Sequence, residues 1–479
     1  MSSSPSQRLL TTYSKKATIQ RILHALTTIH SPSQLTQIQA QILLHNLHHD
    51  TTIVSSFINA CSLLRHLSPA LLLFRHLRRP HTFVSNTLLR VLSLARLPHL
   101  LLLTFSFTHS SSIPPNNYTF PIVLKPLADL RLLPHGAAVH AHAFKTGHAA
   151  DLYVRNSLLN LYSCCDDVEC CEKLFDEMPS REVVAWSTMI MAYRNNGRLD
   201  QALIAFERMQ FAGVAPNRVT MVNALAACAG CGALEMGAWI HDYVRRSGWE
   251  LDVVLGTSLL DMYGKCGRIE DAVKVFERMP EKNVCTWNAL IGGLALAKSG
   301  DEAMRWFFKM EHEGVRPDSV TLVGVLCACS HSGMVEMGRR VFRLMAGGKY
   351  GFRPGIKHYG CMVDLFSRAG MLGSAMEFIE RMPHEPNVVV WGSLLRGSRA
   401  HGDVMLSEVA ARRLVELEPG NVVYYVLLGN LYAEMGRWWD VEELRRMMKE
   451  RRLRKDAGWS LAGAEDNFRE VEELVGTPA

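Results

Sequence analysis

Hydrophobic residues recur at intervals of three and four along most of this chain, which predicts amphipathic helices. Residues 287–294 place Trp, Leu, Ile and Leu at i, i+3, i+4 and i+7, on one helical face. Residues 272–279 place Ala, Val, Phe and Met in the same way. A turn that contains Gly separates the helices of each pair, and a Pro ends the second helix because it cannot continue one. The chain is therefore predicted to form helical hairpins.

These hairpins repeat at a regular interval. Trp186 and Trp287 lie 101 residues apart in the similar stretches VVAWSTMI and VCTWNALI, and Trp391 follows 104 residues later in VVVWGSLL. The second helices are also variants of one another, as in GRLDQALIAFERM (197–209) and GRIEDAVKVFERM (267–279). A period of this kind indicates a repeat architecture.

The repeats predict an all-α solenoid. One hairpin cannot bury its apolar face alone, whereas stacked neighbours can, and the stack presents a long concave surface. The unit lengths cycle approximately as 31, 35 and 35 residues, and a weaker unit covers about 16–50. The fitted units are 51–81, 82–116, 117–151, 152–182, 183–217, 218–252, 253–283, 284–318, 319–355 and 356–387.

Composition and charge limit the classes of partner. The 479 residues are 48% hydrophobic and 20% charged, which argues against disorder. The net charge of +6 is uneven, because residues 1–128 hold eleven Lys/Arg and one acid, Asp50, and so carry +10. The remaining chain carries −4. Nucleic-acid binding would therefore depend on local placement of side chains, aided by a basic N-terminal part.

Three further features concern the compartment. Twelve irregularly spaced cysteines suggest a reducing compartment with buried thiols. No apolar run reaches 18 residues, so we expect no membrane span. Residues 1–15 begin a Ser/Thr-rich, basic, acid-free segment, which predicts either an organelle transit peptide or a disordered N-terminus.

The repeat lengths and sequences resemble one known family. LYVRNSLLNLYSCCDDVECCEKLFDEMP, VCTWNALIGGLALAKSGDEAMRWFFKM and VTLVGVLCACSHSGMVEMG are similar to the pentatricopeptide repeat (PPR) family of land plants. The length cycle resembles its subclass with alternating short, ordinary and long motifs. The resemblance spans roughly residues 16–460. It implies a right-handed superhelical solenoid of about 11 repeats over residues 16–387 that binds single-stranded RNA.

The segment after the repeats resembles the C-terminal extension (E-type) motifs of that subclass. VVVWGSLLRGSRAHGDVMLSEVAARRLVELEPGN (388–421) is similar to the first motif, and YVLLGNLYAEMGRWWDVEELRRMMKERRLRKDAGWS (425–460) to the second. We therefore place extension motifs at 388–460 and a divergent tail at 461–479. Members with these motifs typically take part in cytidine-to-uridine editing of organelle transcripts. The DYW deaminase domain that ends many relatives has no counterpart in the sequence.

The resemblance implies which side chains contact RNA. In this family the fifth and the last residue of a repeat contact one base, and a few side chains per repeat suffice for this. Asn with Asp implies uracil, Ser or Thr with Asn implies adenine, and Asn with Asn implies a pyrimidine. Without the resemblance, Asn and Asp before a helix are ordinary N-caps. The pairs are Asn86 with Asn116, Asn156 with Glu182, Ser187 with Asn217, Thr257 with Asn283, and Asn288 with Asp318.

Some repeats lack a fifth or last residue that could identify a base, and the second residue of each repeat has a different expected role. Glu182 stands where Asp is usual, so its repeat has only a weak base assignment. Pro121 and Val222 occupy the fifth position of long units and offer no side-chain hydrogen bond, while Gly355 and Gly360 also depart from a readable pattern. The second residue of each motif packs against a base plane in the family. Here these residues are Phe83, Tyr118, Tyr153, Val184, Val219, Val254, Cys285 and Val320.

Motifs for catalysis are weak. A zinc deaminase needs H-x-E and P-C-x-x-C, and the chain has no H-x-E. Its C-x-x-C, Cys228 to Cys231, has no preceding Pro and no second ligand pair. The cluster of Cys164, Cys165, Cys170 and Cys171 falls around an inter-helix turn, where small buried side chains are expected. We therefore expect no catalytic residue, no metal, no cofactor, no small-molecule substrate and no enzyme activity.

The sequence thus leads to a hypothesis with alternatives. The chain is expected to recognise single-stranded organelle RNA upstream of a cytidine and to recruit a deaminase-bearing PPR protein or an editing cofactor in trans. A rival is an RNA stabilisation, splicing or processing factor with no editing role. A tetratricopeptide-type peptide scaffold is disfavoured, because those repeats keep to 34 residues. For location we favour the mitochondrion, with the chloroplast as the alternative.

Overall fold

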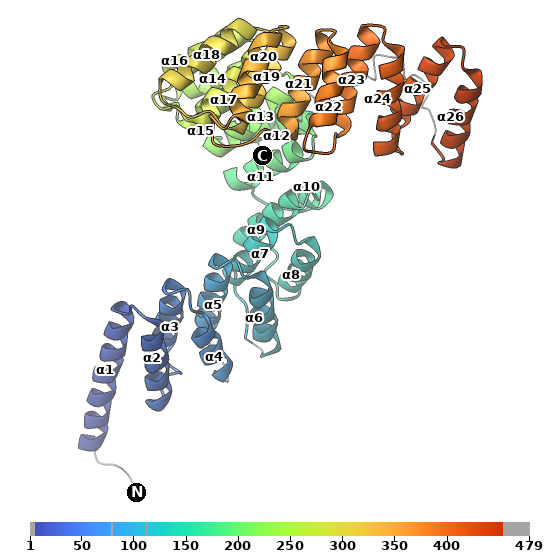
Figure 1. Ribbon diagram of the computed structural model, residues 1–479. Helices are drawn as coiled ribbons and strands as arrows, with labels where there is room; N and C mark the ends of the chain where they lie inside the picture. The colour runs from blue at the N-terminus through green and yellow to red at the C-terminus, as the bar shows by residue number, and fades with distance from the viewer. Residues whose placement is uncertain (1–4, 78–79, 112, 454–479) are drawn as a thin grey trace. The chain divides into compact units, whose positions relative to one another are not determined.

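The computed structural model describes residues 5–77, 80–111 and 113–453. Every regular element in these residues is a helix, which confirms the predicted all-α class (Figure 1). The helices are α1 (Pro5–Thr27), α2 (Pro32–Leu44), α3 (Thr51–Leu63), α4 (Ser68–His76), α5 (Thr82–Leu94), α6 (Pro98–Ser110), α7 (Thr119–Asp129), α8 (Leu133–Lys145), α9 (Leu152–Cys164), α10 (Val168–Asp176), α11 (Val183–Asn195), α12 (Leu199–Phe211), α13 (Arg218–Cys231), α14 (Leu234–Arg246), α15 (Val253–Lys265), α16 (Ile269–Arg278), α17 (Val284–Leu296), α18 (Gly300–His312), α19 (Ser319–His331), α20 (Val335–Ala346), α21 (Ile356–Arg368), α22 (Leu372–Arg381), α23 (Val388–Ala400), α24 (Val404–Leu417), α25 (Val422–Glu434) and α26 (Trp438–Glu450).

Consecutive helices pair into hairpins that stack. Helices α17 and α18, for example, lie within the unit 284–318. The chain divides into two compact units, residues 1–223 and 224–479, and the division falls inside α13. In the first unit α5, α7, α9 and α11 pack side by side in chain order, and in the second α15, α17, α19, α21 and α23 do so. A second helix packs on its own partner and on the next first helix, as α18 does on α17 and α19.

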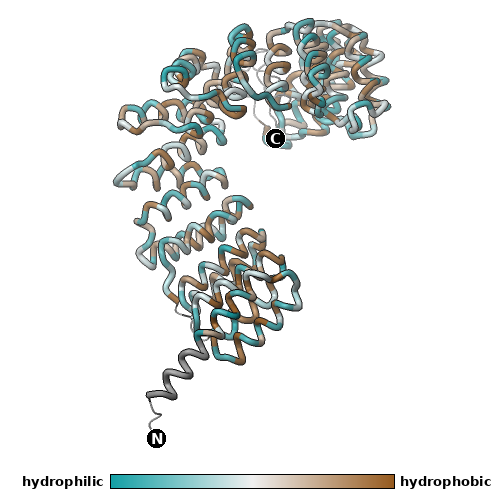
Figure 2. Tube along the Cα trace, turned by 90° about the vertical axis from the view of Figure 1, so that its left-hand side faces the viewer, coloured by the Kyte–Doolittle hydropathy of each residue, from teal (hydrophilic) through white to brown (hydrophobic). Residues whose placement is uncertain are grey.

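The core is built from the apolar stripes predicted by the period. Trp287, Leu290, Ile291 and Leu294 are all fully buried on α17. Figure 2 shows the resulting alternation of hydrophobic and hydrophilic residues along the helices. Burying one side chain such as Phe276 stabilises the fold by roughly 1.5–3 kcal/mol.

The repeated tryptophans have a repeated contact. The ring of Trp186 packs edge-on against Phe175 of the preceding hairpin, with centroids 4.7 Å apart. Trp287 packs against Phe276 in the same way, also at 4.7 Å. The 101-residue spacing of the tryptophans therefore repeats one stacking contact between neighbouring hairpins.

The turn inside each hairpin requires a left-handed residue. Gly197, Gly267 and Gly370 have φ values of +69°, +75° and +74° there. Glycine adopts this conformation without a Cβ clash. Asp166 and Lys298 fill the same position with φ of +60° and +56°, so the turn persists where the sequence has no glycine.

Three sequence predictions concern the N-terminus, the C-terminal tail and the possibility of a membrane-spanning helix. Helix α1 begins at Pro5, so residues 5–15, predicted as a transit peptide or a disordered N-terminus, are helical. The predicted tail at 461–479 and the last part of the extension segment lie outside the described residues. Among the residues that are described, no helix has the length and hydropathy needed to span a membrane.

Candidate nucleic-acid interface

An apolar residue is held out of the core at the start of successive first helices. The large ones are 39–65% exposed, and Cys285 is exposed as well. Such side chains, present once per repeat, offer a surface against which the flat face of a base can pack. They are Phe83, Tyr118, Tyr153, Val184 and Val219 in the first compact unit, and Val254, Cys285 and Val320 in the second.

The fifth residue follows on the same helical face, one turn further along. In repeat 284–318 the amide Nδ2 of Asn288 donates to Asp318 Oδ1 at 3.0 Å. In repeat 82–116 Asn86 Nδ2 donates to Asn116 Oδ1, also at 3.0 Å. The structure thus brings together the fifth and last residues of both repeats. An amide has two N–H groups and two lone pairs, so each Asn can still bond a base edge.

In two repeats the fifth and last residues meet through a third side chain. The hydroxyl of Ser187 lies 2.6 Å from that of Thr220, which in turn donates to Asn217 Oδ1 at 2.9 Å. Thr257 lies 3.0 Å from the hydroxyl of Thr286 in the same manner. Thr286 then lies 3.2 Å from the Oδ1 of Asn283, the predicted last residue of that repeat.

The last residues of these repeats are also N-caps. Asp318 Oδ1 accepts from the backbone N–H of Thr321 at 2.8 Å and so caps α19. Asn283 caps α17 through the N–H of Thr286 at 3.0 Å. A cap of this type stabilises a helix by about 1 kcal/mol. Capping and pairing are therefore compatible, because one side-chain oxygen does both.

Asn156 and Glu182 differ from the other pairs. Glu182 is exposed and makes no side-chain hydrogen bond to the start of α11. Asn156 Oδ1 is buried and has no hydrogen-bond partner in the described residues. No hydrogen bond links the two side chains there, so the structure does not bring this predicted pair together as it does Asn288 and Asp318.

Two groups at this interface were not predicted from the sequence. The first is the threonine three residues after a capping Asn or Asp, which has a visible signal in NNYT, NRVT, NVCT and DSVT at 116–119, 217–220, 283–286 and 318–321. The second is Ser55, the fifth residue of repeat 51–81, whose buried hydroxyl lacks a hydrogen-bond partner in the described part of the chain.

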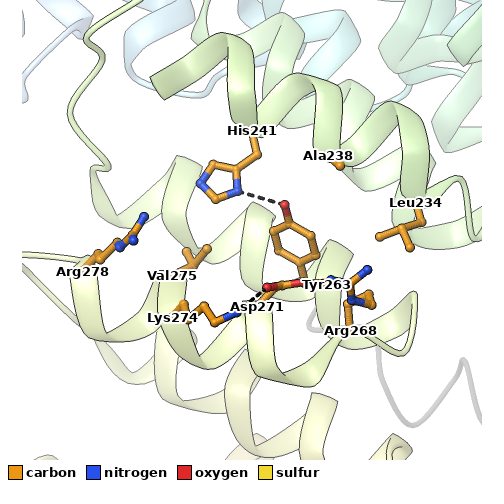
Figure 3. A pocket seen from close by; sticks show the side chains of 9 residues that line it. All are labelled: Leu234, Ala238, His241, Tyr263, Arg268, Asp271, Lys274, Val275 and Arg278. Carbon is orange, nitrogen blue, oxygen red and sulfur yellow. Dashed lines mark hydrogen bonds and ion pairs between the residues drawn. The ribbon is translucent and has the colours of Figure 1, made fainter. Parts of the chain in front are cut away.

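A pocket of about 270 Å³ lies beside α14, α15 and α16 (Figure 3). His241 Nδ1 and the hydroxyl of Tyr263 form a hydrogen bond of 2.9 Å across it. His140 and Tyr162, 101 residues earlier, make the same bond at 2.8 Å. Burial lowers the pKa of His241. This repetition indicates a packing contact between hairpins rather than a ligand site.

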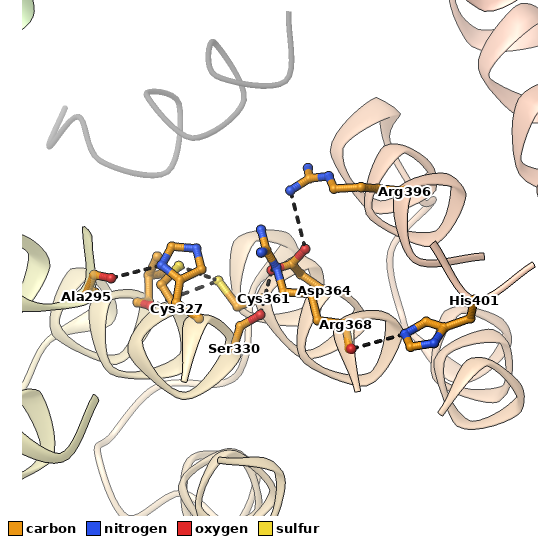
Figure 4. A network of polar contacts seen from close by, with 10 residues as sticks. Ala295, Cys327, Ser330, Cys361, Asp364, Arg368, Arg396 and His401 are labelled. Carbon is orange, nitrogen blue, oxygen red and sulfur yellow. Dashed lines mark hydrogen bonds and ion pairs between the residues drawn. The ribbon is translucent and has the colours of Figure 1, made fainter. Parts of the chain in front are cut away.

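A polar network connects the first helices α19, α21 and α23 (Figure 4). Asp364 Oδ2 accepts from Ser330 Oγ at 2.6 Å and from Arg368 Nε at 2.8 Å. Arg396 lies 3.8 Å from its other oxygen, and His401 Nε2 lies 3.2 Å from the Arg368 carbonyl. The carboxylate is thus neutralised within the protein, and the network joins the last repeats to the segment after residue 387.

The cysteine cluster lies around the predicted turn between α9 and α10, but of its four side chains only Cys171 is buried, so the expected burial is only partly correct. Cys164 ends α9, Cys165 follows it, and Cys170 and Cys171 lie in α10. Burial raises the pKa of the Cys171 thiol to about 12, and it raises the pKa of Cys170 as well. Metal ligands and nucleophiles are thiolates, so raised pKa values disfavour both roles.

Comparison with known sequences gives a consistent class of protein. Family models match this chain as a PPR repeat at residues 153–183, 257–284 and 357–385, and as the PPR repeat family at 181–230 and 282–331. A further model, the E motif, matches residues 401–462. These matches identify a helical-repeat protein with an extension motif.

Curated relatives identify the family. The pentatricopeptide repeat-containing protein At5g56310 of Arabidopsis thaliana is 36% identical over 462 residues, which cover 89% of this chain and 87% of that protein. The chain therefore belongs to the pentatricopeptide repeat family. Arabidopsis relatives named as mitochondrial (At1g77170, 39% identical, covering 74% of this chain and 76% of the relative) and chloroplastic (At2g02980, 36%, covering 94% and 75%) are also similar.

A solved structure has the same fold. The pentatricopeptide repeat protein PPR10 from maize, solved in complex with an 18-nucleotide psaJ RNA element, superposes with a TM-score of 0.67 at 16% identity. The match covers 86% of this chain but only 63% of PPR10. At this identity the likeness concerns the fold, and it confirms the predicted solenoid of stacked helix-turn-helix repeats.

Proposed function

We propose that this protein binds single-stranded RNA of a plant organelle in a sequence-specific way, with one base per repeat. The observation that carries the proposal is the coincidence, on the same helical faces, of exposed second residues and of hydrogen-bonded fifth and last residues. In repeat 82–116, for example, Phe83 is the exposed second residue, and Asn86 is hydrogen-bonded to Asn116. Packing against base faces and hydrogen bonding to base edges are the two contacts that single-strand recognition needs.

The base order follows from the pairs. From the repeat 82–116 to the repeat 356–387 the RNA would carry, 5′ to 3′, pyrimidine, any base, pyrimidine, A, any base, A, U, any base and any base. The two A positions belong to Ser187 with Asn217 and to Thr257 with Asn283. The U belongs to Asn288 with Asp318. In relatives the last repeat lies about four nucleotides upstream of the edited cytidine, so three unread bases would separate this sequence from the target C.

We further propose that the protein selects cytidines for C-to-U editing and that the deaminase acts in trans. The match of residues 401–462 to the E motif supports this part. The extension also exposes Trp438 and Trp439 side by side at the start of α26. Exposed tryptophans of this kind suit a protein partner, here a deaminase-bearing PPR protein or an editing cofactor.

The mitochondrion is the proposed location, with the chloroplast as the alternative. The basic, acid-free N-terminal segment supports import into an organelle. Relatives of similar identity are named for both organelles, so the choice rests on the short Arg- and Leu-containing start.

The test is RNA sequencing of both organelles in plants that lack the protein. The proposal predicts unedited cytidines at one or a few sites, each preceded by A-n-A-U in the stated register. A second candidate function is stabilisation, splicing or processing of an organelle RNA. It would be favoured if every site stayed edited while one transcript lost its ends, its intron removal or its abundance, and that result would overturn the editing proposal.

A further inference from the structure

A threonine contacts the fifth residue of the preceding repeat in four repeat junctions. It is always the third residue of the following repeat, and its side chain is at most 3% exposed. The contacts pair Thr119 with Asn86, Thr220 with Ser187, Thr286 with Thr257, and Thr321 with Asn288. Their distances lie between 2.6 and 3.0 Å. These threonines occupy none of the second, fifth or last positions that are proposed to contact bases.

In repeat 284–318 the hydrogen bonds form a closed ring. The backbone N–H of Asp318 donates to Thr321 Oγ1 at 3.1 Å, and Asn288 Nδ2 donates to Asp318 Oδ1 at 3.0 Å. Thr321 Oγ1 lies 2.6 Å from Asn288 Oδ1. An amide oxygen carries no proton, so the threonine hydroxyl must donate across this short contact. Asp318 Oδ1 also lies 2.9 Å from the hydroxyl, but it already accepts from two N–H groups.

This ring fixes the direction of the Asn288 amide. If the amide turned over, its oxygen would face the carboxylate oxygen of Asp318, and two acceptors would then oppose each other. Repeat 82–116 has the same ring, with Thr119 donating to Asn86 Oδ1 at 2.8 Å. Asn116 Oδ1 accepts from the backbone N–H of Thr119 in α7 and from Asn86 Nδ2. The direction of the Asn86 amide is therefore fixed as well.

Two repeats provide natural controls, because they have a polar fifth residue but no following threonine. The third residue after repeat 152–182 is Ala185, and Asn156 Oδ1 is buried without a hydrogen-bond partner. The third residue after repeat 51–81 is Val84, and Ser55 Oγ is likewise buried without one. Where the threonine is present, the fifth side chain of the preceding repeat is hydrogen-bonded to it. Where the threonine is absent, a buried polar atom of that fifth side chain has no hydrogen-bond partner.

We propose that the third residue of the following repeat is a positioning residue that sets how strictly the preceding repeat discriminates its base. The inference rests on the proposed RNA binding. Uracil and cytosine differ in that one presents an acceptor oxygen where the other presents a donor amine. An amide held in one direction distinguishes them, whereas an amide free to turn over accepts both. Asn288 therefore discriminates U from C. The equally held Asn86 does so too, which narrows the pyrimidine assigned to its repeat to one base, whereas Asn156 accepts either.

The first test compares two RNAs that differ only in U or C at the base assigned to repeat 284–318. The full-length protein is titrated with each RNA, which otherwise carries the proposed base order. We expect the wild type to prefer U about tenfold. Thr321→Val keeps the branched shape and the N–H that Asp318 caps, but it removes the hydroxyl, including its bond from the Asp318 N–H. It should reduce the preference to within about twofold. Thr321→Ser should retain it.

The second test builds the missing contact. Ala185→Thr combined with Glu182→Asp supplies a hydroxyl and a short carboxylate beside Asn156. The ratio of affinities at the base of repeat 152–182 should rise from near one to about fivefold. Ala185→Val with Glu182→Asp is the matched control for side-chain size and should leave the ratio near one. This gain also tests the inference if Thr321→Val fails to fold.

The results separate this inference from the proposed function. If the wild type discriminates U from C and Thr321→Val does so equally, RNA recognition stands and the positioning role is overturned. If the Ala185→Thr and Ala185→Val proteins give equal ratios, the positioning role is overturned as well. If the wild type binds neither RNA above a scrambled sequence, the proposed RNA binding falls and the inference falls with it. An A-to-G change at the base of repeat 253–283 should have the same effect in wild type and Thr321→Val.

Discussion

The repeats and the extension segment use the same hairpin, but they differ in whether their first helices expose large apolar residues. In the repeats, first helices carry exposed apolar second residues such as Tyr153, Val184 and Val254. In the described part of the extension, no large apolar residue of α23 or α25 is exposed. The exposed ones lie on the second helices α24 and α26, and are Val404, Met405, Val409, Leu417, Trp438 and Trp439. One scaffold can therefore present a face for bases in one region and a face for protein in another.

Internal bonding separates the two regions further. In the repeats the polar fifth residues beside the exposed stripe are uncharged amides and hydroxyls with bonding capacity to spare. In the extension Glu408 is only 13% exposed and is saturated by Arg412 at 2.9 Å, Arg437 at 2.7 Å and the hydroxyl of Tyr432 at 3.2 Å. This ionic cluster holds α24 to the final hairpin, and its groups are used internally.

The largest effect expected on editing comes from a change to the face proposed for the protein partner. Trp438→Glu with Trp439→Glu places charges on two mostly exposed positions of α26, so the fold should survive. Editing of the target cytidine in complemented plants should fall at least about tenfold, because buried aromatic anchors dominate interface energies. RNA affinity should stay within about twofold. Equal loss of RNA binding would show that the two faces are not separate.

The second prediction is a change of base preference. Asn288→Thr with Asp318→Asn converts the U-type pair into the A-type pair of Thr257 and Asn283. Each base contact contributes about 1–3 kcal/mol, so the ratio of affinities for U and A should swing by about a hundredfold. Binding to RNAs that vary at the base of repeat 183–217 should not change. An unaltered preference for U would contradict the pairing of fifth and last residues.

A third prediction concerns the junction between the regions. A Cβ on Gly397 of α23 would lie 2.4 Å from the Cβ of Ser367 and 2.7 Å from its backbone oxygen. Gly397→Ala should therefore lower the free energy of unfolding by about 2 kcal/mol through overpacking. Gly429→Ala in α25 meets only Leu444, at 3.9 Å, and should raise it by about 0.5 kcal/mol. Thermal and denaturant unfolding measure both; equal effects would refute the close contact.

Much of the fold could be predicted from the sequence, because the order of apolar and polar residues gives both the helical periodicity and the repeat length. The hairpins and the buried Trp287 stripe follow from the period, whereas the pairing of Asn288 with Asp318 follows from the resemblance to the PPR family. The role of Thr321 was missed, although its Asp-x-x-Thr signal is visible, because a threonine after a cap has an ordinary structural explanation. The missing partner of Asn156 goes with Ala185 in place of the threonine, but this signal can be recognised only once the structure shows which atoms meet across a junction.

The fourth prediction tests the exposed stripe itself. Tyr153→Ala should weaken RNA binding by about fivefold, or ~1 kcal/mol, since stacking on an aromatic ring contributes about this much per base. The ring is mostly exposed, so the unfolding temperature should hardly change. Phe211→Ala on α12 is the matched control, because that ring is even more exposed but lies on a second helix. Equal losses from both variants would remove the distinction between the helices.

The smallest expected effect is a pH dependence. His358 takes the third position of its repeat, accepts from the Gly355 N–H at 3.0 Å, and has a pKa lowered by burial. The unfolded state therefore binds its proton first, and stability falls as pH drops below about 6.5. Between pH 6.5 and 5.5 the loss should be below about 1 kcal/mol. His358→Thr should flatten this part of the curve; an unchanged slope would mean that another group titrates.

The most direct test of the central claim is selection of RNA from a random single-stranded library by the full-length protein, followed by sequencing. The account predicts enrichment of A-n-A-U, with pyrimidines at the first and third positions of the stated register and weaker discrimination at the base of repeat 152–182. An enriched sequence that bears no relation to the fifth and last residues, or no enrichment at all, would contradict it.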